Sequence, residues 1–573
     1  MIKHQWLIAE PAPLEFVDQH PTLPTLVRQV LWQRNITTPT DIEAFLQPEY
    51  ATLTDPFLFR HMRKAVDRII KAIAEHEIIT IYGDYDADGV TATAVIDETL
   101  RALGGKVNWY LPERLSEGYG LNMEAISGFA KNGTRLLVTV DCGTSNVKEI
   151  THAKSLGLDV IVLDHHHQPA ELPPADAIIN PVFADETYPF KNFASAGVAF
   201  TVVRALLKAT DNGATLQHPL GNGWEKWLLD LVAISTVADM MALRGENRTL
   251  VRYGLLVLRK TRRPGLRALF AVMGSPLERA DEHTIGFTVA PRINAAGRLQ
   301  HASIALELLL TTDVVRAQEL AEQLHGINQD RQQLTELAMA EAMEQVAKSD
   351  DQASAITAFA PHWSPGILGL VAGRLADRLW RPAVVMSQNG DEIVGSGRSV
   401  PGVDIMSIMD EGREHFLRYG GHAGACGFTL RSIDQRPRFE TWFRERMAKS
   451  WQPAEEQKLL TIDGRAQLQD FSGPTLDMLE HLGPYGIEHP RPLFVVEGAQ
   501  VVDASTVGND GQHLKLTISD GRNTCRCIGF RFGAQLANYH PGSMIDVAVE
   551  ASWNTWQGRR EPQLRIVDLR VHT

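Results

Sequence analysis

Three aspartates occupy every second position in one short stretch of the chain. In IITIYGDYDADGVTA (78–92), an apolar, β-branched run leads into Asp84, Asp86 and Asp88, and a helix-like segment follows Gly89. The layout predicts a strand, an acidic turn and a helix. Carboxylates this close repel one another at neutral pH, and a bound divalent cation, which prefers oxygen ligands, relieves the repulsion. The stretch therefore indicates a metal site, with an acidic solvated loop as the alternative.

Two later stretches repeat the arrangement of an apolar run followed by an acid. LLVTV (136–140) ends before Asp141, and VIVL (160–163) ends before Asp164, which precedes three consecutive histidines. In open parallel α/β sheets, ligands bind outside the carboxyl ends of the strands. Each acid taken alone could instead be a helix N-cap, because Asp is favoured there. Three strand ends with the same acid, and the histidines at the third, favour one shared site.

An apolar helix offers one further acid. LLDLVAISTVADMMAL (228–243) carries Asp230 and Asp239, nine residues apart, which places them on roughly opposite faces of a helix. Both cannot serve one site. Asp239 is flanked by small and apolar residues, and an acid in such a helix is rarely left unpaired. We therefore expect Asp239 to be the buried ligand.

Length and composition limit the class of protein. At 573 residues, with 44% apolar and 22% charged residues, the chain suits three to four globular domains of about 150 residues each. The N-terminus lacks a basic region followed by an apolar segment, and no apolar run reaches the roughly 18 residues that span a bilayer. The four cysteines form no CxxC pair, so neither a disulfide framework nor a zinc site is indicated. We expect a cytoplasmic protein with no membrane partner.

The charge is acidic overall and locally basic. A net charge of −13 argues against an extended grip on duplex DNA, which needs a broad basic face. One basic patch, formed by Arg259, Lys260, Arg262, Arg263 and Arg267, is best explained as a solvated helix end. The segment 521–573 has seven Arg and no Lys against four acids. Basic patches can therefore coexist with an acidic total.

The chain divides by pattern into five parts. Residues 1–50 form a short helical lead-in, and 51–310 alternate strand-like and helix-like runs, as in stacked βαβ units with a parallel sheet. Residues 311–350 are a long helical pattern that Gly326 interrupts, which suits a connecting helix or a plain packed one. Residues 351–452 form a second, smaller α/β domain, and 453–573 an all-β barrel. The fold class is thus multi-domain α/β with a C-terminal barrel.

Several basic side chains stand in glycine-containing or turn-like stretches. GSGRSV (395–400) and RYGGHAGACGF (418–428) read as turns in which backbone N–H groups can approach a phosphate. Each stretch alone is a weak signal, and together they suggest a second jaw for the phosphates of a substrate. The loop LPERLSEGYGLN adds Arg114, and the turn-like PRINAAGRL adds Arg292 and Arg298. Ordinary surface arginines are the alternative.

The barrel carries aromatic as well as basic residues. Phe530, Phe532, Trp553 and Trp556 lie among its arginines. Bases stack on aromatic rings and phosphates pair with arginine, so this composition suits single-stranded nucleic acid. The alternative is that the four aromatic side chains fill the barrel core.

These motifs together resemble a known family. GDYDADGVTA, VTVDCGTSN and VLDHHHQP look like the DHH phosphoesterase superfamily, and GSGRS and GGHAGACGF look like its companion DHHA1 domain. With the long helix, PRINAAGRL and an OB-like barrel, nearly the whole chain past the lead-in resembles the bacterial RecJ type. The resemblance implies a single-strand-specific 5′→3′ DNA exonuclease of recombination and repair. The family's GGHxxAAG motif has two small residues at the positions that Ala425 and Cys426 occupy in GGHAGACGF, which is a mild departure.

The resemblance also implies residue roles. Asp141 would bridge two ions, Asp164 would orient the neighbouring histidine, and His166 would face the scissile phosphate. The implied metal ligands are Asp84, Asp86, Asp88, Asp141, His165 and Asp239. The implied substrate-binding residues are Ser396, Arg398, Gly421 and His422. Arg114 and Arg298 are further candidates for the 5′-terminal phosphate.

The implied chemistry is metal-dependent hydrolysis. Two ions about 3.5–4 Å apart can activate a water nucleophile and stabilise the leaving oxygen. Mn²⁺ suits mixed carboxylate and imidazole ligands, and Mg²⁺ is the plausible cellular substitute. A narrow cleft between the two α/β domains would admit one strand and exclude a duplex. The expected partner is single-stranded DNA with a 5′ end, with a single-strand-binding protein and a helicase as further candidates, and the protein is expected to be a monomer.

Three other functions keep some of these features. A small-molecule member of the superfamily, such as a manganese pyrophosphatase or an oligoribonuclease, would keep the metal residues but would not need the barrel. A non-catalytic replication scaffold should have lost metal ligands, and this chain keeps them. A pure single-strand-binding protein would not need the aspartate–histidine constellation.

Overall fold

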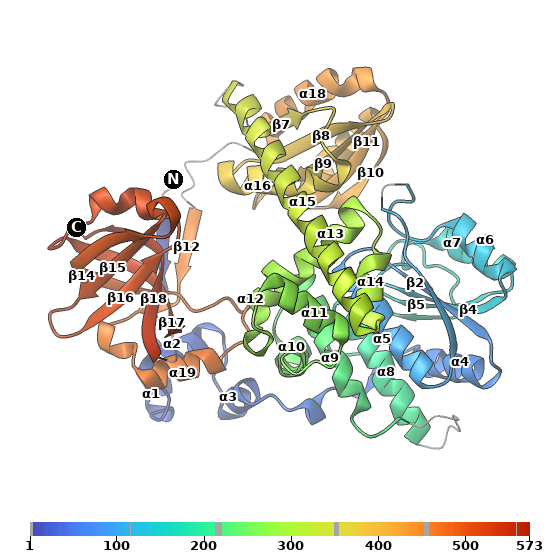
Figure 1. Cartoon of the computed structure of the whole chain (residues 1–573), viewed down its shortest axis with the longest axis horizontal. Helices are drawn as coiled ribbons and strands as arrows, with labels where there is room; N and C mark the ends of the chain where they lie inside the picture. Colours follow the sequence, from blue (N-terminus) through green and yellow to red (C-terminus); the bar gives the residue numbers. More distant parts are fainter. Residues whose placement is uncertain are drawn as a thin grey trace. The chain divides into compact units, whose positions relative to one another are not determined.

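The computed structural model describes residues 4–114, 116–211, 220–348, 354–451, 458–556 and 559–572 (Figure 1). The chain forms two compact units. The larger unit comprises Thr54–Met241 and Gly254–Glu455. The smaller comprises Met1–Leu53, Ala242–Tyr253 and Glu456–Thr573. Each unit is described by itself.

A parallel five-stranded sheet is the base of the larger unit. Its strand order is β3-β2-β4-β5-β6, and every neighbouring pair is parallel. The strands are mostly buried β-branched and leucine runs, as expected for a sheet covered on both faces. The bounds are β2 Ile78–Gly83, β3 Lys106–Tyr110, β4 Thr134–Val140, β5 Asp159–Leu163 and β6 Ala177–Ile179. The predicted parallel sheet is confirmed.

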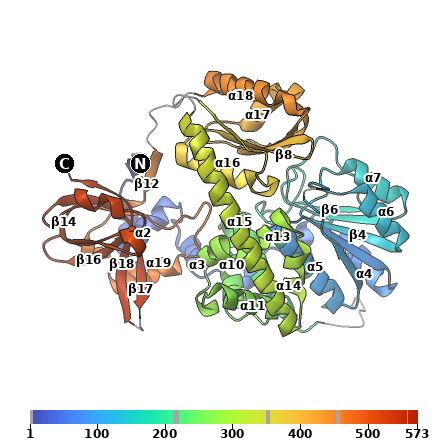
Figure 2. The same ribbon diagram turned by 45° about the horizontal axis from the view of Figure 1, so that its top comes forward.

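Helices cover both faces of this sheet (Figures 1 and 2). Ile126 of α6 and Ile150 of α7 pack with Leu137 and Val160 on one face. Helices α4, α5 and α8 contact the strands from the other face. The bounds are α4 Met62–Ala74, α5 Ala87–Ala102, α6 Met123–Lys131, α7 Val147–Ser155, α8 Ser195–Asp211 and α9 Leu229–Ala238.

Helix α5 begins earlier than its sequence suggests. Asp86 is its N-cap and accepts hydrogen bonds from the backbone N–H groups of Asp88 and Gly89. The prediction that Gly89 separates an acidic turn from the helix is therefore wrong, because the capping carboxylate draws both residues into the first turn. The glycine is required for packing, since a Cβ there would lie 2.6 Å from the backbone oxygen of Asp84.

A second group of helices follows the sheet. Its bounds are α10 Gly245–Leu258, α11 Pro264–Met273, α12 Glu282–Thr284, the π-helical turn η5 Ile285–Val289, α13 Ala290–Leu299, α14 Ser303–Leu310 and α15 Val314–Lys348. PRINAAGRL lies in α13 and is not a turn. Pro291 occupies the first turn of this helix, where a missing N–H costs nothing. Gly297 is needed because a Cβ there would lie 2.5 Å from the Tyr85 backbone oxygen.

The 35-residue helix α15 runs without a break through Gly326. It packs on α11, α13 and α14, while its later residues Ala338 and Ala342 lie in a core with Val371 of α16 and Val385 of β8. The predicted long helix is confirmed, although Gly326 does not interrupt it. It joins the first sheet's helices to the second sheet within the larger unit.

The second sheet is mixed, with the strand order β10-β11-β9-β8-β7. Its elements are β7 Ile356–Phe359, α16 Leu368–Leu379, β8 Ala383–Asn389, β9 Glu392–Arg398, α17 Ile405–Glu411, β10 Phe416–His422, β11 Ala425–Leu430 and α18 Arg436–Ser450. The glycine-rich stretches are strands here, and their prediction as turns is wrong. Two glycines serve sheet packing, since a Cβ at Gly395 would meet the Phe428 ring at 2.2 Å and one at Gly397 the Cys426 sulfur at 2.6 Å.

The smaller unit contains a closed five-stranded barrel. Strands pair in the ring β14-β15-β16-β18-β17 and back to β14. The bounds are β12 Lys458–Ile462, β13 Gly464–Arg465, α19 Gly473–His481, β14 Phe494–Val507, β15 His513–Ser519, β16 Thr524–Gly529, β17 Met544–Trp556 and β18 Arg559–Val571. The predicted barrel is confirmed.

Apolar side chains of the first fifty residues pack into the core of the barrel. The expected helices are present as α1 Leu14–Gln19, α2 Thr25–Gln33 and α3 Pro39–Leu46. They follow a strand, β1 His4–Ile8, that pairs in parallel with β12. Val27 and Leu31 of α2 are buried in the same cluster as Phe494 and Val547 of the barrel. Among the described helices, none combines the length and hydropathy of a membrane span.

Candidate metal centre and substrate-binding residues

The carboxyl ends of three adjacent strands bring the predicted acids together. Asp84 follows β2, Asp141 follows β4 and Asp164 follows β5, and the three strands are neighbours in the sheet. All three side chains are buried, with 5%, 3% and 1% of their residue surfaces exposed. The three acids are far apart in sequence, and the parallel sheet brings them to one edge, as predicted.

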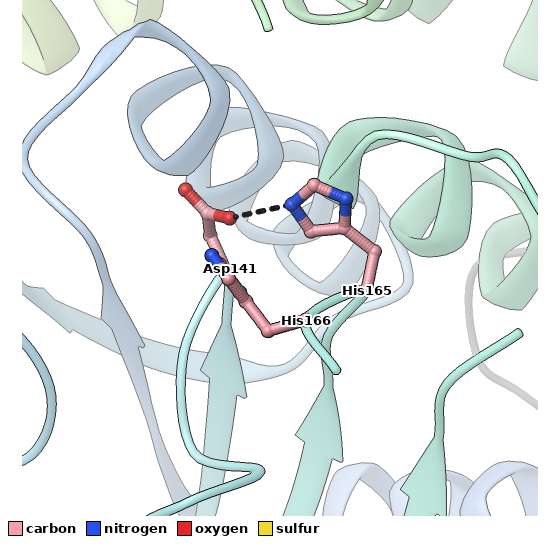
Figure 3. A group of neighbouring side chains, drawn as sticks. All are labelled: Asp141, His165 and His166. Atoms are coloured by element: carbon pink, nitrogen blue, oxygen red, sulfur yellow. Dashed lines mark ion pairs between the residues drawn. The ribbon is translucent and has the colours of Figure 1, made fainter. Parts of the chain in front are cut away.

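Two sets of possible ligand atoms meet at Asp141. One set joins Asp84, Asp86 and Asp141, and a second joins Asp141, His165 and His166; within each set the atoms lie within 4.8 Å of one another. The Nε2 atom of His165 lies 3.3 Å from Oδ1 of Asp141, which Figure 3 shows as a dashed line. Asp141 is thus within reach of both the acidic side and the histidine side of the cluster.

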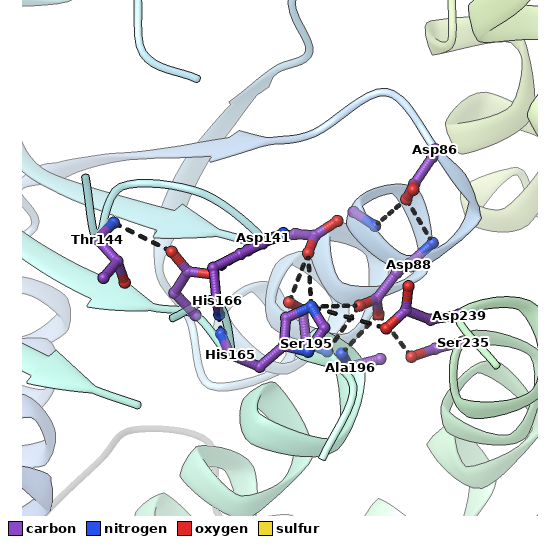
Figure 4. Close-up of polar contacts among 12 residues, drawn as sticks. Asp86, Asp88, Asp141, Thr144, His165, His166, Ser195, Ala196, Ser235 and Asp239 are labelled. Atoms are coloured by element: carbon purple, nitrogen blue, oxygen red, sulfur yellow. Dashed lines mark hydrogen bonds and ion pairs between the residues drawn. The ribbon is translucent and has the colours of Figure 1, made fainter. Parts of the chain in front are cut away.

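A third set completes the histidine side. Asp88, His165 and Asp239 also place ligand atoms within 4.8 Å of one another. The Nε2 atom of His165 lies 3.6 Å from Asp88 Oδ2 and 3.7 Å from Asp239 Oδ2 (Figure 4). The six residues predicted as metal ligands are therefore brought together.

The donors fit divalent cations. Oδ1 of Asp84 is buried and has no hydrogen-bond partner among the described residues. Burial, and then the charges of neighbouring carboxylates, raise the pKa values of Asp84 and Asp141 well above their usual range. The same two causes raise the pKa of Asp239 to about 8. A buried set of carboxylate oxygens with one imidazole nitrogen is a ligand set that Mn²⁺ and Mg²⁺ accept.

The backbone is strained at two of these positions. Asp141 itself has φ 62°, and Met240, directly after Asp239, has φ 56°. Residues with side chains rarely adopt this left-handed region, and such strain gathers at functional sites. Gly143, with φ 113°, follows in the same turn, and a Cβ there would lie 2.5 Å from Oγ1 of Thr139. This tight turn sets the direction of the Asp141 side chain.

Several residues that sequence reasoning missed hold the acids in place. Ser195, the first residue of α8, donates its backbone N–H to Asp88 Oδ2 at 2.8 Å and its hydroxyl to Asp141 Oδ1 at 2.8 Å. Ala196 N–H and the Ser235 hydroxyl donate to Asp88 Oδ1 at 3.1 and 2.6 Å. The positive end of α8 therefore faces the carboxylates (Figure 4). A serine before a small-residue helix signals a helix start, but not its target.

Asp164 contacts the second histidine. Its Oδ1 lies 2.7 Å from Nδ1 of His166 and accepts the backbone N–H of His165, while its Oδ2 accepts the N–H of Thr144. Burial alone would lower the pKa of His166, but the hydrogen bond and charge of Asp164 raise it to about 9. Tyr119 places its hydroxyl 3.2 Å from the same Nδ1. Asp164 thus orients the His166 ring and favours its protonated form, while His167, also exposed, has no such partner among the described residues.

The two acids near α9 separate as predicted, but the expectation that Asp239 is the buried one is wrong: Asp230 is 1% exposed, whereas Asp239, directly after the helix, is half-buried. Asp230 accepts hydrogen bonds from Thr261 Oγ1 at 2.7 Å and pairs with Arg263 at 3.1 Å. Arg263 also pairs with Glu98. The acid is therefore structural. Arg263, which belongs to the basic patch of residues 259–267, is therefore held in ion pairs and is not solvated, contrary to the prediction.

Three predicted phosphate-binding arginines converge. Arg398 donates to Ser396 Oγ at 3.2 Å and to the Gly397 carbonyl at 2.8 Å, and Arg298 donates to the Gly366 carbonyl at 3.3 Å. Burial, then Arg114, Arg331 and Arg398, lower the pKa of Arg298 to about 10. Residues from three distant stretches therefore form one cationic group.

His422 lies on the second sheet in register with Arg398. Ala425 of β11 pairs with both, with His422 of β10 on one side and Arg398 of β9 on the other. The two side chains therefore project from the same face of the sheet, and their Cα atoms, two strands apart, are separated by about 10 Å. The imidazole is exposed, and its Nδ1 accepts the N–H of Gly424. Gly421 precedes it, and a Cβ there would lie 2.2 Å from the Ala425 carbonyl oxygen.

Fewer of the barrel's arginines and aromatic rings are available to bind nucleic acid than its composition suggests. Four of its arginines form ion pairs with carboxylates of the same unit: Arg526, Arg560, Arg565 and Arg570. Phe532 and Trp553 pack partly against the core. Phe530 is 53% exposed beside His513 and the exposed Arg531. The Trp556 side chain lies outside the described residues.

Family models match three segments of the chain. The DHH family N-terminal domain matches residues 78–236, the DHHA1 domain 352–449 and the RecJ OB domain 462–568. The first segment holds all the possible metal ligands except Asp239, which lies three residues beyond its end, and the second holds Arg398 and His422.

Relatives match over nearly the whole chain. The single-stranded-DNA-specific exonuclease RecJ of Bacillus subtilis is 36% identical over 573 residues, which cover 99% of this chain and 71% of the relative. The crystal structure of RecJ from Thermus thermophilus with Mn²⁺ superposes with a TM-score of 0.84 at 29% identity, covering 99% of this chain and 80% of that one. The same protein with Mg²⁺ gives a TM-score of 0.78 at 28% identity, covering 99% and 78%.

Proposed function

Because the chain belongs to the family of RecJ single-stranded-DNA-specific exonucleases, we propose that it degrades single-stranded DNA from the 5′ end by metal-dependent hydrolysis. The observation that carries this proposal is the position of Asp141, whose carboxylate lies within ligand distance of both the aspartate set and the histidine set. One shared carboxylate between two sets of ligands is what a two-ion site requires.

The ions would be held by the chain's own carboxylates and one imidazole. Asp84, Asp86 and Asp141 would hold one ion, and Asp88, Asp141, His165 and Asp239 the other. Mn²⁺ or Mg²⁺, when bound, supplies charge that favours a water nucleophile and the departing 3′-oxygen. One crystal structure of RecJ from Thermus thermophilus contains Mn²⁺ and another contains Mg²⁺, which supports these two metals as the ions that would be bound.

The remaining residues position the substrate. His166, whose Nδ1 is hydrogen-bonded to Asp164, would donate a hydrogen bond from its other ring nitrogen to an oxygen of the scissile phosphate. Ser195 and Ser235 fix the Asp88 carboxylate, and so its direction towards the site. A charged hydrogen bond of this type contributes about 1.5–3 kcal/mol.

Polarity would follow from the arginine group. Arg114, Arg298 and Arg398, with Ser396, would bind the 5′-terminal phosphate and so place the next phosphodiester bond at the metal centre. Gly421 and His422 would contact the same end of the strand from β10. Arginine binds phosphate through two parallel hydrogen bonds, which fixes orientation as well as affinity.

A direct comparison of substrates tests this function. The wild-type protein with Mn²⁺ should release nucleotides from a long 5′-phosphorylated single strand and spare the matching blunt duplex. Preferential cleavage of pyrophosphate or dinucleotides would favour a small-molecule phosphoesterase instead. Binding without cleavage would favour a scaffold or a strand-binding protein.

The wider setting rests on the family resemblance. We propose a cytoplasmic monomer that acts in recombination and repair, with a helicase and a single-strand-binding protein as partners. Phe530 and Arg531 of the barrel would contact the strand beyond the cleavage site. Size-exclusion chromatography with light scattering tests the monomer.

A further inference from the structure

Six arginines of the larger unit share one region without a carboxylate to balance them. Among the described residues, no ion pair joins an acid to any of them, whereas Arg68, Arg101 and Arg263 of the same unit are each paired. The six come from the loop after β3, from α13, α15, α16 and β9: Arg114, Arg292, Arg298, Arg331, Arg374 and Arg398. Three of them account for the terminal phosphate in the proposed function, and Arg292, Arg331 and Arg374 remain.

Arg331 is the least satisfied of these three. Its Nε is buried and has no hydrogen-bond partner among the described residues. An unpaired buried donor on a cation is costly and calls for an acceptor from outside the chain. Arg28, Arg34 and Arg68 also have such a nitrogen, but each donates through another nitrogen to an oxygen of the chain, whereas no side-chain hydrogen bond of Arg331 is found among the described residues. Arg292 donates to the Thr288 carbonyl at 2.7 Å and to Nδ1 of His325 at 3.3 Å, so its contacts are neutral.

The outer arginines lie on helices that pack against one another. Helix α15, which carries Arg331, packs on α13, which carries Arg292 and Arg298, and on α16, which carries Arg374. Arg114 partly offsets the raised pKa of Asp84, and Asp86 partly offsets the lowered pKa of Arg298, so the inner arginines lie near the acids. Arg298 is influenced in turn by Arg331, and Arg331 by Arg374 and Arg292. Helix α16 adds its positive end, because a Cβ at Gly369, in its first turn, would lie 2.9 Å from Nη2 of Arg398.

We propose that Arg331 and Arg374, with Arg292, form an outer anion site that binds the second and third phosphates of a strand carrying a 5′-triphosphate. The inference rests on the proposed function, in which the inner arginines bind the first phosphate. A strand that enters with its 5′ end at the inner arginines places any further 5′ phosphates beyond them, where the outer arginines lie. The downstream part of the strand lies on the other side of the metal centre.

The resulting activity is the removal of a triphosphorylated first nucleotide. Water adds to the phosphorus between the first and second nucleotides, and the bond from that phosphorus to the 3′-oxygen breaks. One proton of the water is transferred to the 3′-oxygen. A nucleoside triphosphate leaves, and the shortened strand begins with a 5′-monophosphate.

The test compares two synthetic DNA strands that differ only in a 5′-monophosphate or a 5′-triphosphate. First-nucleotide release is measured as kcat/KM with excess Mn²⁺. Wild-type protein should cleave the triphosphate strand at least as well as the monophosphate strand. Arg331→Gln and Arg374→Ala should lower the triphosphate-to-monophosphate ratio about tenfold each, the size of one lost charged hydrogen bond. Later cycles, which start from identical 5′-monophosphates, are an internal control.

Arg267→Ala on α11, an exposed arginine of the same unit, is the matched control and should leave the ratio unchanged. Arg331→Gln should also keep or raise the thermal midpoint of the free protein, because it removes an uncompensated cation; a clear fall would make Arg331 structural and overturn the inference. Equal losses on both strands, or a wild-type rate tenfold lower with the triphosphate, would overturn it too. A wild-type protein that degrades neither strand would refute the proposed function, and this inference with it.

Discussion

Replacement of Asp141 by asparagine should remove activity more completely than replacement of any acid that belongs to one ligand set. Asp141 is in both the aspartate set and the histidine set, so two ion contacts are lost. At about 2 kcal/mol for each charged contact, the loss is about 4 kcal/mol, or roughly a thousandfold in rate. Asp86 belongs to one set only, and Asp86→Asn should cost about thirtyfold.

Asp86→Asn is a matched control because it removes one charge and keeps the helix cap. Asparagine caps helices about as well as aspartate, so the start of α5 should survive. Both variants are assayed for single-turnover release of the first nucleotide over a range of Mn²⁺ concentrations. The metal content of the same preparations is measured in parallel.

Thermal unfolding tests Asp141→Asn in a second way, because the variant should be more stable than wild type without metal and less stable with it. The buried carboxylate has a raised pKa, so its removal relieves repulsion in the metal-free protein and should raise the midpoint. With Mn²⁺ present the same variant should be less stable than wild type, because it binds the ions less tightly. Equal activity losses in the Asp141 and Asp86 variants, or more than a tenth of wild-type activity in Asp141→Asn at saturating Mn²⁺, would refute the bridging role.

The other predictions concern the histidines, the second sheet and the barrel. His165→Ala should lose both metal and activity, whereas His167→Ala should stay near wild type in the same assays. Arg398→Lys should lower kcat/KM about tenfold and Arg398→Ala about a hundredfold, with metal content unchanged, and a parallel loss of metal would contradict the phosphate role. Phe530→Ala should weaken binding of long single strands, measured by fluorescence anisotropy, while short oligonucleotides are cleaved at the wild-type rate; unchanged affinity would assign the barrel another task.

The site was more predictable than the segments around it. Asp84, Asp141 and Asp164 could be placed together because strand ends in a parallel sheet share one edge. Asp230 and Asp239 could be separated by helical spacing alone. Ser195 and Ser235 could not be found, since their partner Asp88 is distant in sequence and a hydroxyl carries no spacing signal.

The wrong predictions at two glycines share a physical cause. Gly395 and Gly397 are turn formers by local preference, yet each lies inside a strand because tertiary contacts decide. Pro291 is wrongly predicted as a turn residue, although proline is also favoured in the first turn of a helix, where it lies. A Cβ at either glycine would overlap a side chain of the neighbouring strand. Local sequence shows the freedom of glycine but not the crowding that requires it.

The shared core of α2 and the barrel also determines when the smaller unit can fold. Val27 and Leu31 are made well before Phe494 and Val547, with which they share a buried cluster. The larger unit lies between them in sequence and can fold as it emerges. Until then α2 has only the apolar side chains of its own N-terminal segment to pack against, among them Phe16 and Ile42. The smaller unit therefore depends on two segments that the larger unit separates in sequence, and we expect its core to form only after both have been made.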